Sequence, residues 1–203
     1  MITLYHSAQS RSVRPRWMLE EIGVPYDLRR VNLEAGEQKT PEFLKINPNG
    51  AVPALVDGEV KLFESGAISQ YLADRFPEKR LAPPVGTPAR GYYYQWIHFG
   101  LCTIEPPLLT IFLHTVAKPE SERIPQLLEP ARQQLRAALA VLDRALAGHT
   151  FLVGDDLTTG DVMVASTLAW AQMLGLLDAS FPATAAYLGR LMGRSAFRRA
   201  MAD

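Results

Sequence analysis

The sequence predicts an α/β domain followed by an all-helical domain, and three observations carry this prediction. Strand and helix patterns alternate over the first 76 residues, a proline-rich segment follows, and the rest of the chain shows only helical periodicity. A chain of 203 residues has room for two small domains. We therefore expect a first domain over residues 1–78, a linker over residues 79–87 and a helical bundle domain over residues 88–203.

The first elements alternate between strand and helix. Residues 2–5 predict a strand, and residues 13–22 predict a helix that stops at Gly23. Residues 26–32 set apolar side chains loosely against polar ones, which is typical of a second strand.

The order continues with a short helix over residues 41–46, which has proline at its first position. Residues 54–56 and 60–63 then predict a β-hairpin around an Asp-Gly turn, and an amphipathic helix follows from residue 65 to residue 76. The resulting order β-α-β-α-β-β-α is the one that a thioredoxin-like domain requires, with a mixed sheet covered by helices.

The hairpin is flanked by features that suit an extended peptide ligand. Pro53 opens a strand and leaves Val52 extended, with its backbone N–H and C=O free to pair with something else. Glu64 and Ser65 stand where the hairpin ends and a helix begins, and a serine there offers N–H groups and a hydroxyl to a carboxylate. Together these features indicate a peptide-binding site.

Beyond the linker, only helices are expected. One helix begins at residue 88 and runs toward Pro106, and a second covers residues 125–147 with an apolar stripe. Thr158 and Asp161 have the spacing of a helix capping box. Residues 162–177 carry no charge but are too few for a membrane span, so we expect a buried core helix.

Composition excludes several function classes. The formal net charge is zero, which argues against a nucleic-acid or anionic-membrane partner, and the arginines of residues 190–199 are expected on a solvated helix face. The N-terminus shows no signal peptide, and a single cysteine, Cys102, fits a reducing compartment such as the cytoplasm. The four histidines are too scattered to suggest a metal site.

Three segments resemble one known family. Three patterns are similar to the cytosolic-type glutathione transferases: Asn-Pro-x-Gly-x-Val-Pro-Ala-Leu at residues 47–55, Glu-Ser-Gly-Ala-Ile at residues 64–68, and residues 151–161. Within that family we expect a bacterial serine-type member. The resemblance extends to both ends of the chain. It implies a thioredoxin-like domain that binds glutathione and a helical domain that carries a hydrophobic substrate site.

The resemblance implies specific roles around the hairpin. The Val52–Pro53 peptide is expected to be cis, with the Val52 backbone paired with the cysteinyl part of glutathione. Glu64 and Ser65 are expected to hold the γ-glutamyl end.

The catalytic group is expected in the segment before the first helix. In serine-type members the catalytic serine precedes a helical arginine by about four residues, and counting back from Arg14 gives Ser10. A hydroxyl, a helix N-terminus and a cation such as Arg11 can each stabilise a thiolate. Ser10 or Ser12 can alternatively cap the helix; we assign capping to Ser12 and catalysis to Ser10, with Ser7 as a further candidate.

Further contacts to both substrates follow from the resemblance. Gln38 and Lys39 match positions that meet the glycyl carboxylate, whereas Ala51 lacks the longer side chain often found before the Val-Pro pair. The hydrophobic second substrate is expected between the domains, against an aromatic-rich helix. The candidate residues for that cleft are Arg11, Tyr94, His98 and Cys102.

The leading functional hypothesis is an enzyme that conjugates glutathione, its co-substrate, to hydrophobic electrophiles without a permanently bound cofactor. Glutathione-dependent isomerisation or peroxide reduction on the same site is an alternative, although isomerase members carry Ser-Ser-Cys where this chain has Gln9, Ser10 and Arg11. A non-catalytic glutathione-binding protein is a third. The family resemblance and the apolar content of residues 68–76 and 92–99 also predict a homodimer.

Overall fold

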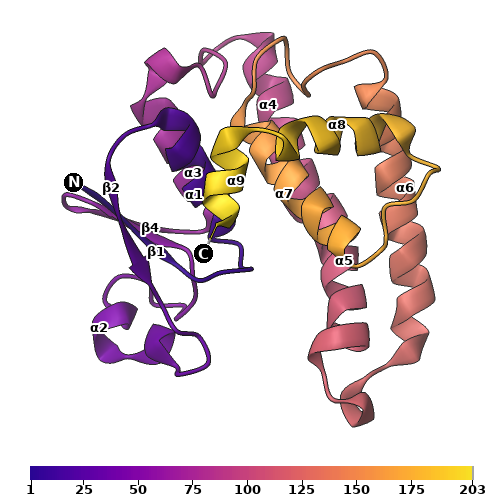
Figure 1. Ribbon diagram of the computed structural model, residues 1–203, viewed down its shortest axis with the longest axis horizontal. Helices are drawn as coiled ribbons and strands as arrows, with labels where there is room; N and C mark the ends of the chain where they lie inside the picture. Colours follow the sequence, from indigo (N-terminus) through magenta and orange to yellow (C-terminus); the bar gives the residue numbers. More distant parts are fainter. Residues whose placement is uncertain (203) are drawn as a thin grey trace. The chain divides into compact units, whose positions relative to one another are not determined.

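A four-stranded mixed sheet forms the centre of the N-terminal unit (Figure 1). Its strands are β1 (Ile2–His6), β2 (Tyr26–Arg30), β3 (Ala54–Asp57) and β4 (Val60–Phe63), and they lie in the order β2-β1-β3-β4. β1 pairs with β2 in parallel and with β3 in antiparallel fashion, and β3 and β4 form the predicted hairpin. This topology confirms the predicted thioredoxin-like domain.

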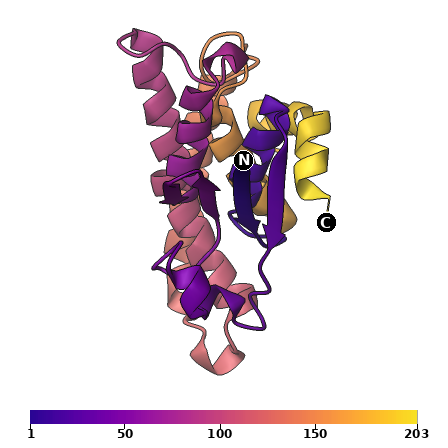
Figure 2. The ribbon, with the colours of Figure 1, turned by 90° about the vertical axis from the view of Figure 1, so that its left-hand side faces the viewer.

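Helices lie on both faces of this sheet (Figure 2). They are α1 (Val13–Ile22), α2 (Pro41–Leu44) and α3 (Ser65–Arg75). Alternation along β1 buries Leu4 on the face against which α1 and α3 pack, whereas the Tyr5 ring meets Phe43 of α2 at 5.6 Å between centroids. α1 has the predicted bounds and ends at Gly23, whose left-handed φ of 74° suits a glycine.

This computed structural model describes residues 1–202. The chain forms two compact units. The first unit contains Met1–Ala82 together with the segment from Met192 onward, and the second contains Pro83–Leu191. The expected range of 88–203 for the helical domain therefore differs from the second unit at its C-terminal end. Helix α9 (Ser195–Met201) belongs to the first unit because it packs on α1.

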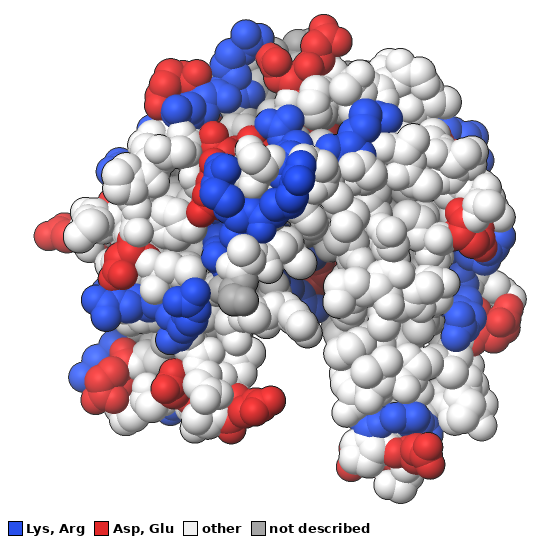
Figure 3. Space-filling view, in the orientation of Figure 1, with Lys and Arg blue, Asp and Glu red and all other residues white. Residues whose placement is uncertain are grey.

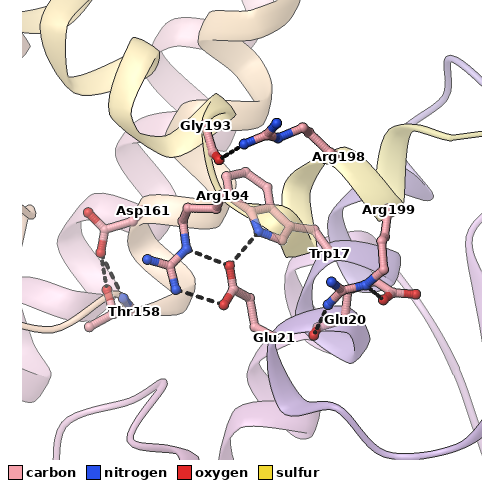
Figure 4. Close-up of polar contacts among 9 residues, drawn as sticks. All are labelled: Trp17, Glu20, Glu21, Thr158, Asp161, Gly193, Arg194, Arg198 and Arg199. Carbon is pink, nitrogen blue, oxygen red and sulfur yellow. Dashed lines mark hydrogen bonds and ion pairs between the residues drawn. The ribbon is translucent and has the colours of Figure 1, made fainter.

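An aromatic contact and two arginine–glutamate pairs hold α9 on α1, and Figure 4 shows the arginine–glutamate pairs. The Trp17 and Phe197 rings meet edge to face at 4.8 Å, and Arg194 forms a two-point contact of 2.7 and 2.8 Å with the Glu21 carboxylate. Arg199 likewise pairs with Glu20 at 2.6 Å. The arginines of residues 190–199 are mostly exposed, as expected for a solvated face, but Arg194 and Arg199 also pair with carboxylates of α1. Figure 3 shows acidic side chains beside the basic ones around α9.

The second unit is entirely helical over the described residues. Its helices are α4 (Pro88–His98), α5 (Glu105–Phe112), α6 (Leu128–Leu146), α7 (Thr159–Met173) and α8 (Pro182–Met192). Residues 162–171 of α7 are mostly buried, as predicted for a core helix, whereas Gln172 and Met173 at its end are exposed. Thr158 donates from its N–H at 2.8 Å and its hydroxyl at 2.9 Å to Asp161, which confirms the capping box (Figure 4).

The first long helix does not end near Pro106. A π-helical turn, Phe99–Ile104, joins α4 to α5, so one continuous helix runs from Pro88 to Ala117. The wider turn accommodates Pro106, which has no N–H for the regular ladder. By length and composition this helix is the one candidate for a membrane span among the described residues, but core helices of soluble proteins meet the same criterion.

Candidate active site

Strand register brings the candidate residues to one edge of the sheet. Tyr5 of β1 pairs with Ala54 of β3, and Ala54 pairs in turn with Phe63 of β4. The segments that extend these strands at that edge therefore start at Ser7, Val52 and Glu64. β2 ends at the same edge because it is parallel to β1, so the loop that carries Gln38 and Lys39 also begins there.

Ser10 lies in a tight turn between β1 and α1. Gln9 adopts a left-handed φ of 53°, which bends the chain back on itself. The Ser10 hydroxyl lies 2.7 Å from the Ser7 carbonyl oxygen and 2.6 Å from the Ser12 hydroxyl. Ser10 is half-buried, so part of this residue remains open to solvent.

Ser12 does not cap α1, so that prediction is wrong. It stands at the N-cap position, but its backbone is helical and its side chain makes no capping hydrogen bond. The hydroxyl points instead into the unit, where it lies 2.7 Å from Nδ1 of His6 and accepts the Ser7 N–H at 3.1 Å. A buried imidazole outcompetes the helix N–H groups for this hydroxyl.

Two residues of this cluster, His6 and Arg16, were not predicted from the sequence. His6 is fully buried at the end of β1, and its Nε2 lies 3.1 Å from the Arg16 guanidinium. Arg16 is also buried and donates to the Ala202 carbonyl oxygen at 2.6 Å. The available signal is that His6 continues the inward-facing alternation of Ile2 and Leu4.

Val52 has the expected backbone geometry. The Val52–Pro53 peptide is cis, which confirms that prediction. The β-ladder begins at Ala54, so Val52 lies outside it, and its side chain packs on the small core cluster of Val31 and Phe43. The Val52 backbone is therefore held firmly at the sheet edge without belonging to the sheet.

The start of α3 is a candidate anion-binding corner. Ser65 is the first residue of the helix and is buried, and Arg14 of α1 donates from Nη1 to its hydroxyl oxygen at 3.2 Å. Glu64 is exposed and has a φ of 72°, an unfavourable value for a residue with a side chain. Such a strained residue beside a helix N-terminus is a common feature of ligand sites.

Lys39 is brought to the Val52 segment, and Gln38 is held within its own loop. The Lys39 ammonium donates to the Asn49 carbonyl oxygen at 3.3 Å and passes over Gly50, where a Cβ atom would lie 2.8 Å from Nζ. The Gln38 amide donates to the Leu33 carbonyl oxygen at 3.3 Å. Lys39 is therefore the better placed of the two for a ligand carboxylate.

In the helical unit, Tyr94, His98 and Cys102 follow one another at intervals of four residues along α4 and the π-helical turn. All three are exposed and lie on one side of the helix. In the other unit Arg11 is exposed in the turn before α1. Among residues 1–202, no group of three or more His, Cys, Asp or Glu side chains is arranged to hold a metal ion.

Buried ionisable groups outside this edge are structural. Burial raises the pKa of Asp161, although four hydrogen bonds from Leu152, Thr158 and Tyr187 favour its ionised form. Burial, followed by the charge of Asp161, raises the pKa of Tyr187 far above its ordinary value.

Comparison with known families agrees with this geometry. The model of the glutathione S-transferase N-terminal domain matches residues 1–74, and that of the C-terminal domain matches residues 125–190. Glutathione S-transferase GstB of Escherichia coli is 31% identical over 203 residues, covering 98% of this chain and 97% of that protein. Glutathione S-transferase F10 of Arabidopsis thaliana is 31% identical over 170 residues, covering 80% and 77%.

A solved structure shows the same similarity. It is a glutathione transferase family member from Pseudomonas fluorescens with two glutathione bound, and it superposes with a TM-score of 0.87 at 31% identity. The match covers 98% of this chain and 92% of that one. The similarity therefore extends through both units.

Proposed function

This chain belongs to the glutathione S-transferase family of enzymes, and we propose that it activates the glutathione thiol as a thiolate and transfers it to hydrophobic electrophiles. The observation that supports this most is the convergence of Ser10, Val52 and Ser65 at one edge of the sheet. A nucleophile-stabilising hydroxyl, an open backbone and an anion corner are together what glutathione requires.

Glutathione binds along this edge in an extended form. Its γ-glutamyl carboxylate accepts from the N–H groups at the start of α3 and from the Ser65 hydroxyl, and Glu64 pairs with the γ-glutamyl amino group. The cysteinyl backbone pairs with Val52, preceding the cis Pro53, and the glycyl carboxylate lies toward Lys39. Gln38 stays in the loop beside it and makes at most a secondary contact.

The Ser10 hydroxyl and the N-terminus of α1 stabilise the thiolate. A free thiol has a pKa of about 8.5, so lowering it by about two units requires roughly 3 kcal/mol of differential stabilisation. One hydrogen bond to a charged group supplies about 1.5 to 3 kcal/mol, and the helix dipole adds to it. The thiol proton passes to solvent water when glutathione binds.

The transfer step is a nucleophilic displacement. The thiolate sulfur forms a bond to an electrophilic carbon with its electron pair, and the bond from that carbon to its leaving group breaks, with the leaving group departing as an anion. Tyr94, His98 and Cys102 on the exposed side of α4 are our candidates for contact with the electrophile, and Arg11 adds positive potential near the serine turn. We expect this reaction to take place in the cytoplasm.

The Ser10→Ala variant tests the proposal. It should lower turnover of chlorodinitrobenzene at neutral pH about tenfold or more and move the rate-versus-pH midpoint upward, with little change in glutathione affinity. Full activity with an unmoved pH profile would contradict the role of Ser10. Retention on immobilised glutathione without turnover of any electrophile would instead indicate a non-catalytic binding protein.

A further inference from the structure

We propose that His6 and Ser12 are positioning residues that fix the direction of the Ser10 hydroxyl hydrogen. The four side chains of Arg16, His6, Ser12 and Ser10 form a continuous hydrogen-bonded row from the interior of the N-terminal unit to the half-buried serine turn. The inference rests on the proposed function, since it concerns how Ser10 is prepared to meet the glutathione thiolate.

The direction of the row is set at its buried end by Arg16. A guanidinium can only donate hydrogen bonds, so Nε2 of His6, 3.1 Å from Nη1 of Arg16, must accept. The imidazole is therefore neutral and carries its proton on Nδ1, which donates to the Ser12 hydroxyl oxygen at 2.7 Å. The second Arg16 contact, to the Ala202 carbonyl oxygen, holds the guanidinium in place.

The groups that donate to Ser12 determine whether its hydroxyl can accept from Ser10. Its oxygen accepts from His6 Nδ1 and from the Ser7 N–H at 3.1 Å, which uses both of its lone pairs. Ser12 cannot then accept from Ser10. The Ser12 hydrogen has two acceptors within reach, the Ser10 hydroxyl oxygen at 2.6 Å and the Ser7 carbonyl oxygen at 3.0 Å, and the shorter contact favours donation to Ser10.

The same count applies to Ser10. Its oxygen receives the Ser12 hydroxyl and, at 3.2 Å, the Ser12 N–H. Because both Ser12 groups donate to the Ser10 oxygen, the Ser10 hydrogen cannot point toward Ser12. It points instead to the Ser7 carbonyl oxygen at 2.7 Å. When a thiolate binds, the hydrogen exchanges this carbonyl for the sulfur anion. A hydroxyl that accepts two hydrogen bonds is also a better donor.

No proton travels along the row. Its effect is to orient and polarise the Ser10 hydroxyl, and each hydrogen stays on the atom that donates it. Both His6 and Ser12 are fully buried, where burying a polar group costs stability unless it is hydrogen-bonded. A leucine in place of His6 would fill the same space without the cost of burying a polar group. The buried polar pair therefore has a role in the serine turn that a leucine could not supply.

The test is the thiol pKa of bound glutathione, measured from thiolate absorbance in the binary complex. Ser12→Ala and His6→Leu should each raise the midpoint by about half to one pH unit, because each removes one hydrogen bond of ordinary strength from the row. His6→Asn should restore it, since the asparagine amide can place an N–H where Nδ1 donates. The matched control is Ser69→Ala, which removes another fully buried serine hydroxyl in the same unit and should leave the midpoint unmoved.

A raised midpoint in Ser10→Ala together with an unmoved one in Ser12→Ala and His6→Leu would overturn the positioning role and leave the proposed function intact. Absence of any thiolate signal from the wild type would overturn the proposed function, and this inference with it. If either variant fails to fold, nitrogen-15 spectra of the wild-type imidazole decide. A neutral ring protonated on Nδ1 supports the row, and an Nε2–H tautomer or an imidazolium at neutral pH overturns it.

Discussion

At the residue scale, the Ser65 hydroxyl at the first turn of α3 accepts a hydrogen bond from Arg14. Its own hydrogen can still donate to a ligand carboxylate. We predict that Ser65→Ala raises the Michaelis constant for glutathione about tenfold and changes the turnover number little, because the lost bond is made to a bound charge. Steady-state kinetics with glutathione varied will measure this. An unchanged Michaelis constant would exclude Ser65 from the γ-glutamyl site.

Tyr26 makes the unit sensitive to alkali. Burial, followed by the hydrogen bond that it donates to Glu20 at 2.7 Å, raises the pKa of Tyr26 to about 12 from an ordinary value of 10. Between these pH values the folded state binds more protons than the unfolded state, so the stability that this group contributes is present below pH 10 and is lost as the pH rises toward 12.

The Tyr26→Phe variant should therefore lose less stability than the wild type between pH 10 and pH 12. Urea unfolding midpoints across this range will show the difference. Tyr94→Phe, which alters an exposed tyrosine of the helical unit, is the control and should follow the wild type. If the unfolding midpoints of the wild type and Tyr26→Phe fall in parallel as the pH rises, the raised pKa of Tyr26 is contradicted.

At the element scale, the start of α7 depends on one carboxylate. Asp161 is fully buried and accepts four hydrogen bonds, from the Leu152 N–H, the Thr158 N–H and hydroxyl, and the Tyr187 hydroxyl. We predict that Asp161→Ala destabilises the protein by about 3 kcal/mol or more, because it leaves several buried donors without an acceptor. Tyr187→Phe removes a single donor and should cost only about 1 kcal/mol. Thermal unfolding will measure both, and an Asp161→Ala cost below that of Tyr187→Phe would refute the capping role.

Local signals predicted those elements whose ends are encoded by neighbouring residues. Gly23 ends α1, Thr40 caps α2 and Thr158 caps α7, each by contacts within a few residues. The π-helical turn before Pro106 and the 3-10 turn at Pro125–Leu127, which delays α6 to Leu128, were not predicted. Both occur where proline removes a donor, and the local pattern does not say how the helix adjusts.

The candidate site likewise contains residues that local sequence identifies and residues that it does not. Val52 and Ser65 are identified by proline and helix-start chemistry in their own segments. The inward turn of Ser12 depends on His6, six residues away on another element, and a capping pattern alone cannot show it. Sequence therefore locates the candidate ligand-binding backbone better than the side chains that support Ser10.

At the scale of the whole chain, the C-terminal segment completes the first unit. Arg194 and Arg199 of this segment pair with glutamates of α1, more than 170 residues earlier in the sequence. Nothing in the local pattern of residues 190–199 indicates such partners, which is why the expected range of the helical domain extended to the end of the chain. These contacts between residues distant in sequence fix the position of α1, and hence of the serine turn, relative to the last helix.

The apolar side chains that led us to expect a homodimer now fall into two groups. Ile68 and Leu72 of α3 are fully buried within their own unit, so they supply no surface for a partner. On α4, Trp96 and Ile97 are buried, whereas Tyr92 is 59% exposed. The proposal of a homodimer therefore depends on the outer side of α4 and on the family to which the chain belongs.

We predict that light scattering at micromolar concentration will give twice the chain mass of 22.5 kDa. Tyr92→Glu should weaken the dimer about 30-fold or more, since a buried tyrosine at an interface commonly contributes about 2 kcal/mol and a carboxylate there would lose its hydration. Val116→Glu places the same charge at another exposed apolar position of the long helix and should leave the mass unchanged. A wild type that remains monomeric would show that Tyr92 is a solvent-facing side chain and that each chain carries its site alone.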